Sequence, residues 1–401
     1  MSFPFPRPRS AACMGLLALA FGALAQTNRP TIREAADAAW ALSAQARSFT
    51  ARQSELDARS RAAGAFFAGP PTISVSHQAG QGTARGARET DVEVSAPLWP
   101  SGLKSATAAQ VDADRAALTA QVAAARLKLA AQARDLAADA ALARTQVELA
   151  GRKFDEARVL AQDTERRVKA GDSARIDSLR AQSAASEAEA ARAGAEAALA
   201  RALALWRALT GLSGTAVLDE AVLPDGVNPL AASAEAQVRA ARAKLDVAEA
   251  DRRDPVEAGI GIVRERSGPG TGTDNSLRLS LRVPLGGDIR NSGRIALARA
   301  ELDIAEAELD ITNRQIAAER EAARAEWQAA TRSENLAANR ERLAREAQEL
   351  IARSHRLGES DLPARLRADA ERFEAESARA RAYIEARRAL SRLNQANGAT
   401  P

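Results

Sequence analysis

The sequence contains almost no sulfur. Its single cysteine, Cys13, and both methionines, Met1 and Met14, fall within the first 25 residues. Without that segment no disulfide can form, which excludes a small secreted domain held together by disulfide bonds. Thiolate and thioether ligands for soft metal ions are missing as well, and the only histidines are His77 and His355. We therefore expect no metal site.

Large apolar side chains are also scarce. Aromatic residues make up 3% of the chain and charged residues 27%, while alanine is abundant. A globular core of this size normally relies on more large side chains, so the composition favours long, thin helices packed side by side. After residue 25 no apolar run approaches the ~20 residues of a transmembrane helix. If the chain crosses a membrane, it must do so with strands.

The two signs of charge nearly cancel. The chain has 56 basic and 52 acidic residues, and loss of the first 25 residues would remove only Arg7 and Arg9, leaving 54 against 52. The charges alternate along the predicted helices and form no basic patch. Nucleic-acid binding is therefore not expected.

Residues 1–25 have the features of a secretory signal peptide. Two arginines precede an apolar run, and Ala23-Leu24-Ala25 offers a cleavage site of the small-x-small type. We expect export, followed by a mature chain of residues 26–401 that forms a single domain.

The mature chain repeats one pattern at an offset of 187 residues. Pro97 in Ala-Pro-Leu matches Pro284 in Val-Pro-Leu, and Gly171 matches Gly358 at the same offset. This predicts an internal duplication, with repeats over about 30–212 and 229–397. Such a unit cannot bury its own apolar faces, so the pattern predicts an assembly.

Each repeat is predicted to contain a helix, a β-hairpin and a long helical hairpin, a mainly α fold with a small β part. The first helix should cover residues 31–65, opened by a capping box of Thr31 and Glu34. Period-two alternation around glycine-rich loops predicts β-hairpins at about 70–99 and 258–285. Antiparallel coiled-coil hairpins follow at about 101–210 and 288–397, and the end of the chain from Asn397 is expected to fray.

The long helices carry apolar residues at coiled-coil spacing. The stripes consist of Val111, Leu118, Val122, Leu129 and Leu136 in the first repeat, and Ile295, Leu302, Leu309 and Ile316 in the second. At ~1.5 Å per residue, each long helix would extend about 100 Å.

The strands suggest a wall between lipid and water. Over residues 276–283 every second side chain is aliphatic, and the others include Arg278 and Arg282. This pattern is typical of a membrane β-barrel, although an amphipathic hairpin on a soluble core remains an alternative. The predicted lipid-facing residues are Val92, Val94, Leu277, Leu279, Leu281 and Val283. Phe66, Phe67 and Trp99 would lie at one end of the strands as an aromatic belt.

Four strands cannot close a barrel, and open strand edges cannot face lipid, because unpaired backbone groups there cost several kcal/mol each. Closure must therefore come from other copies of the chain. Three copies would supply twelve strands, within the known range for such barrels.

The order of elements, the Ala-Pro-Leu-Trp-Pro and Val-Pro-Leu-Gly-Gly strand ends and the glycine-containing helix tips together resemble the outer membrane efflux protein family, the TolC-like outer membrane factors. Among its branches the chain is most similar to the CzcC-like components of metal-efflux systems. The resemblance covers essentially the whole mature chain.

This resemblance implies a homotrimer in the outer membrane of a Gram-negative bacterium. A twelve-stranded barrel would continue into the periplasm as an α-helical tunnel. The tunnel would dock a proton-driven inner-membrane pump through periplasmic adaptor (membrane fusion) proteins. Such channels are passive, and heavy-metal cations are the candidate cargo.

The helix tips would form the periplasmic mouth, where the family contacts adaptors and gates the tunnel. Glycine there permits the positive φ of a tight reversal. Carboxylates repeated three times around a narrow opening would favour cations, but acids at a helix start are also routine caps. The candidate residues are Gly171, Asp172, Ser173, Asp177, Gly358, Glu359, Ser360 and Asp361.

No nucleophile and base are paired in the sequence, so enzyme activity is not expected. The loop Gly268–Thr273 lacks the Lys-Ser/Thr of a phosphate-binding loop, and no cofactor is expected. The rival function is a periplasmic coiled-coil adaptor or scaffold; an adaptor would carry one helical hairpin per chain, flanked by compact β domains that are richer in strands.

Overall fold

A computed structural model describes residues 29–224, 226–285 and 289–399. The predicted signal peptide lies outside these residues. The helices are α1 (Ile32–Leu42), α2 (Ala44–Gly64), α3 (Leu103–Ala170), α4 (Arg175–Thr210), α5 (Pro229–Ala250), α6 (Ile289–Arg356) and α7 (Leu362–Ala396). The strands are β1 (Thr72–Ala79), β2 (Arg88–Pro97), β3 (Glu257–Arg266) and β4 (Asp274–Arg282), and a short 3₁₀ turn, η1 (Gly82–Ala84), lies in the first hairpin loop.

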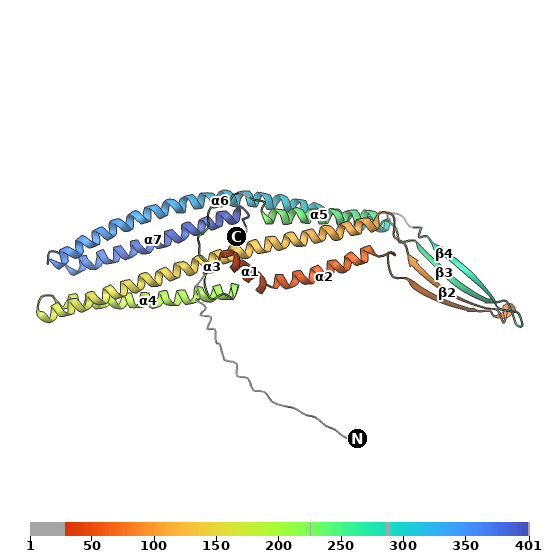
Figure 1. Cartoon of the computed structure of the whole chain (residues 1–401), viewed down its shortest axis with the longest axis horizontal. Coiled ribbons are helices and arrows are strands. Elements are labelled where there is room, and N and C mark those ends of the chain that lie inside the picture. Colours follow the sequence, from red (N-terminus) through yellow and green to blue (C-terminus); the bar gives the residue numbers. More distant parts are fainter. Residues whose placement is uncertain (1–28, 225, 286–288, 400–401) are drawn as a thin grey trace, which may run out of the picture.

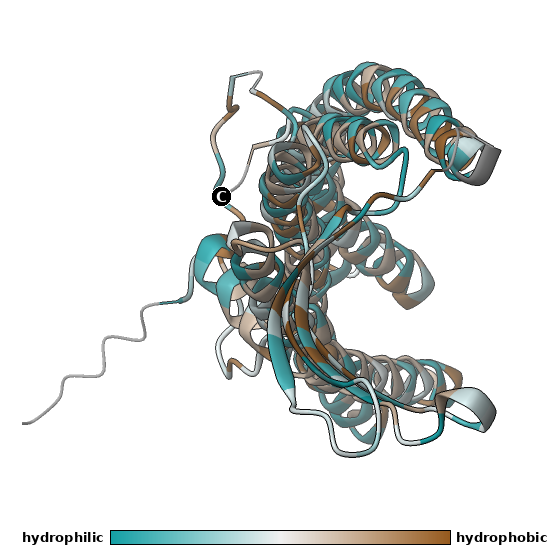
Figure 2. Ribbon diagram, turned by 90° about the vertical axis from the view of Figure 1, so that its right-hand side faces the viewer, coloured by the Kyte–Doolittle hydropathy of each residue, from teal (hydrophilic) through white to brown (hydrophobic). Residues whose placement is uncertain are grey.

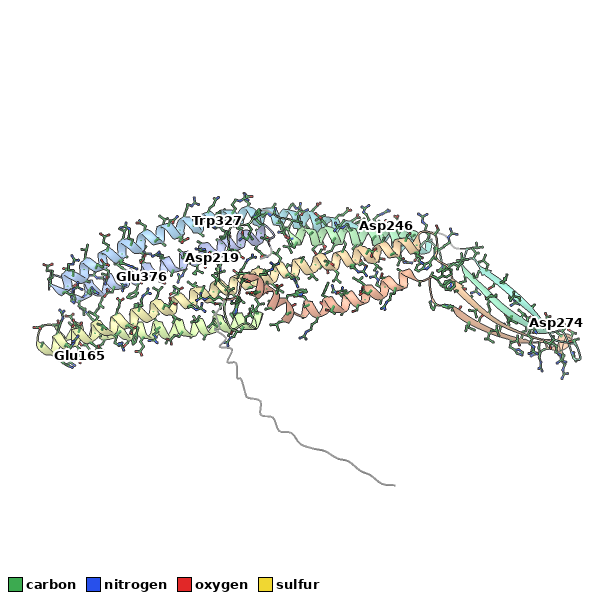
Figure 3. The ribbon with its side chains drawn as sticks, in the orientation of Figure 1. Glu165, Asp219, Asp246, Asp274, Trp327 and Glu376 are labelled. Atoms are coloured by element: carbon green, nitrogen blue, oxygen red, sulfur yellow. The ribbon has the colours of Figure 1, made fainter. Side chains whose placement is uncertain are left out.

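The molecule is a long rod with the sheet at one end and two helix tips at the other (Figure 1). Among the labelled side chains, Glu165 lies beside a tip and Asp274 lies at the far end of the sheet (Figure 3). The helices α3 and α6, of 68 residues each, run the length between them. The predicted lengths of the long helices are therefore confirmed.

The helices form one curved layer rather than a closed bundle. Near the sheet the packing order is α2, α3, α5, α6, and toward the tips it is α4, α3, α7, α6. Viewed along the rod, the helices lie along an arc (Figure 2). In this arrangement α6 forms one edge of the layer along its whole length, whereas α3 has neighbours on both sides.

The first helical segment is interrupted, contrary to the sequence prediction of one helix over residues 31–65. The capping box itself is confirmed, since Thr31 and Glu34 exchange hydrogen bonds of 2.8 and 3.2 Å. The break occurs at Ser43, whose backbone is extended (φ −71°, ψ 147°). Its hydroxyl accepts a hydrogen bond from Ala46 N at 3.1 Å and so caps a new helix, α2.

The core is made mostly of small side chains. Alanine dominates the buried residues, as the composition predicted, and Trp206 is the largest fully buried side chain. Trp206 packs with Ile32, Ala133 and Ala137, and its indole N–H donates to Gly214 O at 2.9 Å. Members of both predicted stripes are buried, including Val111, Leu118, Leu302 and Ile316.

The connection between the repeats and the end of the chain pack together halfway along the rod. Buried Arg134 on α3 donates to Glu220 at 2.8 Å and to Gln395 at 2.7 Å. The prediction of a frayed end is wrong for the described residues 397–399. Asn397 is buried, and Ala399 N donates to Asn394 O at 3.0 Å.

The four strands form one antiparallel sheet in the order β1-β2-β3-β4. Both predicted hairpins are present, and in addition β2 pairs with β3 along its length, with Val92 opposite Ile262. The strand pattern did not reveal this pairing between the hairpins. Because β4 ends at Arg282, Val283 lies just beyond the strand and not within it as predicted.

Candidate functional site

One face of the sheet is apolar from edge to edge. Directly paired residues share a face, and two such rows cross all four strands: Val75, Val92, Ile262 and Leu277, and Ile73, Val94, Ile260 and Leu279. All eight side chains are exposed, as are Leu281 on the same face and Val283 after β4. The predicted lipid-facing residues therefore form part of one continuous apolar surface, and their contact with lipid remains a prediction.

The opposite face is polar and concave. On β4, Arg278 forms ion pairs with Glu89 and Asp91 of β2, and Ser280 contacts Glu93 of β2. These contacts cross over β3, although strands two apart are separated by about 9.6 Å. Gly259 on β3 leaves space for them, because a Cβ there would overlap the Glu93 carboxylate. The strands curve accordingly (Figure 2).

Both outer edges of the sheet are open. In the described part of the chain, β1 pairs only with β2 and β4 pairs only with β3. Each outer strand therefore presents backbone N–H and C=O groups without a strand partner.

Three aromatic residues meet where the sheet joins the helices. The rings of Phe66 and Phe67 pack edge to face at 4.9 Å. The indole N–H of Trp99 donates to Ala65 O at 3.0 Å, and Lys104 donates to the same oxygen at 2.9 Å. These aromatics lie at one end of the strands, as predicted. Their place in a membrane interface remains a prediction.

The first helix tip closes through its glycine. Gly171 has φ +86°, and its N–H donates to Val168 O at 3.1 Å. Asp172 N donates to Arg167 O at 2.8 Å. This pair of bonds is a Schellman motif, which satisfies the last carbonyls of α3.

The second tip closes in the same way. Gly358 has φ +80°, and its N–H donates to His355 O at 3.1 Å. Glu359 N donates to Ser354 O at 3.0 Å. The tight reversals predicted for both glycines are confirmed, and the two tips lie at the same end of the molecule (Figure 1).

The acids at the tips differ in their contacts. Asp361 accepts a hydrogen bond from Ala364 N at 2.9 Å and caps α7. Asp177 lies 4.0 Å from Arg180, while Asp172 and Glu359 are exposed. Asp361 thus has the capping role that was the alternative to a gate.

The tip serines and His355 are partly buried. His355 Nδ1 lies 3.0 Å from Ser360 O, so this nitrogen donates to the carbonyl, and the Ser360 hydroxyl donates to Ile351 O at 3.4 Å. Ser173 occupies the matching position in the first tip. Adaptor contact and gating at the tips remain predictions.

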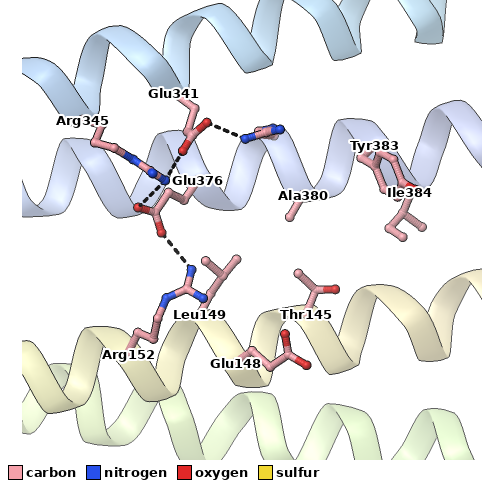
Figure 4. Close-up of a pocket in the computed structure, with 11 residues that line it drawn as sticks. Thr145, Glu148, Leu149, Arg152, Glu341, Arg345, Glu376, Ala380, Tyr383 and Ile384 are labelled. Carbon is pink, nitrogen blue, oxygen red and sulfur yellow. Dashed lines mark hydrogen bonds and ion pairs between the residues drawn. The ribbon is translucent and has the colours of Figure 1, made fainter.

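Between the tips and the middle of the rod, a charged cluster joins the two helical hairpins (Figure 4). The carboxylate of Glu376 on α7 is buried and forms ion pairs with Arg152 of α3 at 3.1 Å, Arg372 at 3.0 Å and Arg345 of α6 at 3.6 Å. Buried Glu341 of α6 pairs with Arg345 and with Arg379, the latter at 2.7 Å. All of these residues except Arg372 line a recess of about 310 Å³.

A neighbouring carboxyl extends this cluster. Glu156 of α3 forms an ion pair with Arg372 of α7. Burial raises the pKa of Glu156, against the lowering effect of Arg372. None of this cluster was predicted from the sequence, because its charged residues occupy positions that are typical of solvated helix faces.

The edge helix α6 exposes a row of large aliphatic side chains. They recur every seven residues in two runs, Leu297, Ile304 and Ile311, then Leu336, Leu343 and Leu350, and Leu357 continues the second run just after the helix ends. Such spacing is that of a coiled-coil contact, yet no helix of the described chain covers it.

Within the residues that the structure describes, no group of three or more His, Cys, Asp or Glu side chains is placed to hold a metal ion. His77 instead contacts Thr90, with Nδ1 2.9 Å from the hydroxyl. None of the described helices combines the length and apolar character that a membrane span requires.

No family model and no curated protein sequence matches the chain. Its fold is similar to that of the outer membrane protein VceC from Vibrio cholerae, with a TM-score of 0.73 and 17% identity over 92% of this chain and 96% of that one. The comparison with CusC, a protein studied for transmembrane channel formation, gives a TM-score of 0.72 and 16% identity and covers 92% of each chain. The comparison with the CmeC outer membrane channel of Campylobacter jejuni gives a TM-score of 0.72 and 13% identity, and it covers 92% of this chain and 85% of that one. The chain therefore shares the fold of these three proteins.

Proposed function

We propose that this chain is one subunit of a homotrimeric channel in the outer membrane of a Gram-negative bacterium, which acts as the exit duct of a tripartite efflux system. The observation that carries the proposal is that one chain leaves the edges of its sheet unpaired and an edge of its helical layer uncovered. Its sheet has two free edges and an exposed apolar face, and its helical layer has an uncovered aliphatic edge on α6. The fold shared with outer membrane channels supports the same conclusion.

Three copies would close the sheet into a barrel and the helical layer into a tunnel. The free edge of β4 would pair with β1 of the next copy, giving a barrel of twelve strands. The apolar rows would then face lipid and the concave polar face would line the pore. Pairing all edges removes the cost of several kcal/mol for each backbone group left unpaired in lipid.

The exposure of residues related by the 187-residue offset supports both the duplication and this mode of closure. Leu149 on α3 is 8% exposed, whereas its counterpart Leu336 on α6 is 71% exposed; Ala117 is 6% exposed and its counterpart Ile304 58%. Within one chain α3 is covered by α5 and α7. The equivalent cover for α6 would be α2 and α4 of the next copy.

The tips, at the end opposite the sheet, are the proposed docking point for a periplasmic adaptor and, through it, an inner-membrane pump. The channel itself would be a passive conduit. Heavy-metal cations, as suggested by the resemblance to CzcC-like proteins, are one candidate cargo. Since the mature chain has no sulfur ligand, selection of the cargo would reside in the pump.

Membrane fractionation and electrophoresis without boiling test the proposal. We expect a heat-sensitive trimer in the outer membrane fraction, and steady single-channel currents when that trimer is added to a planar bilayer. A monomer recovered from the soluble periplasm would refute the channel and favour the adaptor or scaffold alternative.

A further inference from the structure

The charged side chains of the sheet are sorted between its two faces. The register places all acidic residues of the strands on the concave polar face, namely Glu89, Asp91, Glu93, Glu257, Glu265 and Asp274. The apolar face has no acid and three arginines, Arg88, Arg264 and Arg266. This separation leaves positive charge without compensation on the apolar side.

The three arginines lie together at the loop end of the sheet. Arg88 is directly opposite Arg266 on the neighbouring strand, and Arg264 is two residues away on the same face. Like charges in directly opposed positions destabilise a sheet. All three side chains are exposed, and none forms an ion pair with any residue that the structure describes. Arg266 Nε donates only to the carbonyl of Gly268, at 3.2 Å.

Closure of a barrel would not neutralise these arginines. The strand that a second copy would add next to β4 is β1, and Thr72–Ala79 contains no charged residue. The two hairpin loops, 80–87 and 267–273, contain no acid and add another cation, Arg85. A compensating anion must therefore come from outside the protein.

The position of the arginines indicates which anion. Arg264 is two residues from Ile262, so the arginines directly follow the apolar rows at the end opposite Trp99. Long arginine side chains beside an apolar surface extend their charged ends toward the headgroup region of a bilayer. There the guanidinium group matches phosphate with paired hydrogen bonds.

We propose that Arg88, Arg264 and Arg266 form a binding site for the phosphate groups of an anionic lipid in the membrane leaflet at the loop end of the channel. The inference rests on the proposed function, because it requires the apolar rows to face lipid. A lipid is favoured over free phosphate because the arginines adjoin the surface on which acyl chains would lie.

Native mass spectrometry of the purified full-length protein in detergent tests the site. The probes are lipid A carrying both phosphates and the same lipid A with its phosphates removed. We expect the wild type to retain the phosphorylated form at least about tenfold better. The triple variant R88Q/R264Q/R266Q should lose this preference, to less than about twofold.

The matched control is Arg282→Gln, which removes the same charge from an exposed arginine on the opposite face. It should retain the wild-type preference. Equal retention of both lipids by the wild type would overturn the site without reference to any variant. Displacement of lipid A by millimolar inorganic phosphate would overturn the assignment to a lipid.

Planar-bilayer recordings of the same preparations separate this inference from the proposed function. A trimer that conducts but shows no phosphate preference overturns the lipid site alone. A preparation that never conducts overturns the proposed function. Electrophoresis without boiling confirms that the triple variant is still an assembled trimer.

Discussion

At the scale of single residues, Asp361 allows its two predicted roles to be separated. Its carboxylate caps α7 through Ala364 N. Asparagine caps a helix about as well as aspartate, whereas alanine does not. We expect Asp361→Asn to leave the free energy of unfolding nearly unchanged and Asp361→Ala to lower it by about 1 kcal/mol. Denaturant titrations followed by circular dichroism measure the difference, and equal losses in both variants would contradict the capping role.

The same Asp361→Asn variant tests the gate, because it removes the charge and keeps the cap. If carboxylates at the tips restrict cations, single-channel conductance should rise or block by cations should weaken. Glu359→Gln is the matched partner, since Glu359 is exposed and caps no helix. Unchanged currents in both variants would exclude a gate at these acids.

Asp114 on α3 makes stability depend on pH. Burial raises the pKa of its carboxyl, and Arg59 at 3.0 Å opposes the rise. Of the smaller effects, the charge of Glu55 raises this pKa and the charge of Lys244 lowers it. Because the pKa is higher in the folded than in the unfolded chain, folding is favoured as the pH falls through the folded pKa, and this contribution is lost above it.

We therefore expect the melting temperature of the wild type to rise relative to that of Asp114→Asn as the pH is lowered from neutral toward the ordinary pKa of aspartate, about 3.9. Parallel melts of both proteins provide the measurement. A difference that stays constant with pH would contradict the assignment.

At the scale of elements, the contact between the hairpins depends on Glu376. Its buried carboxylate contacts arginines from α3, α6 and α7. We expect Glu376→Gln to cost about 1–3 kcal/mol, because hydrogen bonds to a buried charge are lost. Arg152→Gln should cost less than about 1 kcal/mol, because that arginine is largely exposed. Denaturant titrations distinguish the two, and equal costs would argue against a central role for Glu376.

Local patterns predicted the elements well and their partners poorly. Seven-residue spacing, period-two alternation and the tip glycines located the long helices, the hairpins and both reversals. The pairing of β2 with β3 was missed because the two strands lie about 170 residues apart in the sequence. Patterns within each strand do not specify the register of such a distant pair. The break at Ser43 was missed because one serine inside a helical pattern does not by itself signal a cap.

The candidate site was predicted only in part, because local sequence patterns do not show which elements become neighbours in the fold. The tip residues and one aliphatic face of each hairpin could be found from spacing alone. The Glu341 and Glu376 cluster could not, since its members come from three helices whose neighbours are set only by the tertiary fold. Among the tip acids, spacing alone could not show that Asp361 is already used as a cap.

At the scale of the whole molecule, the aliphatic row of α6 should decide whether subunits associate. We expect the double variant L343D/L350D to lose the trimer band in unboiled gels while keeping its helical content by circular dichroism, because charges would replace apolar contacts. The control is Val227→Asp, a substitution of an exposed aliphatic residue in the connection between the repeats. Persistence of the trimer in L343D/L350D would refute this interface.

In the proposed trimer, the unpaired outer strands would also constrain biogenesis. A single subunit in the bilayer would have unpaired backbone groups along β1 and β4, and this cost would be removed only when the third subunit completes the barrel. In that case insertion and association would occur together. The rate at which folded channels accumulate should consequently rise more steeply than linearly with the amount of newly exported polypeptide.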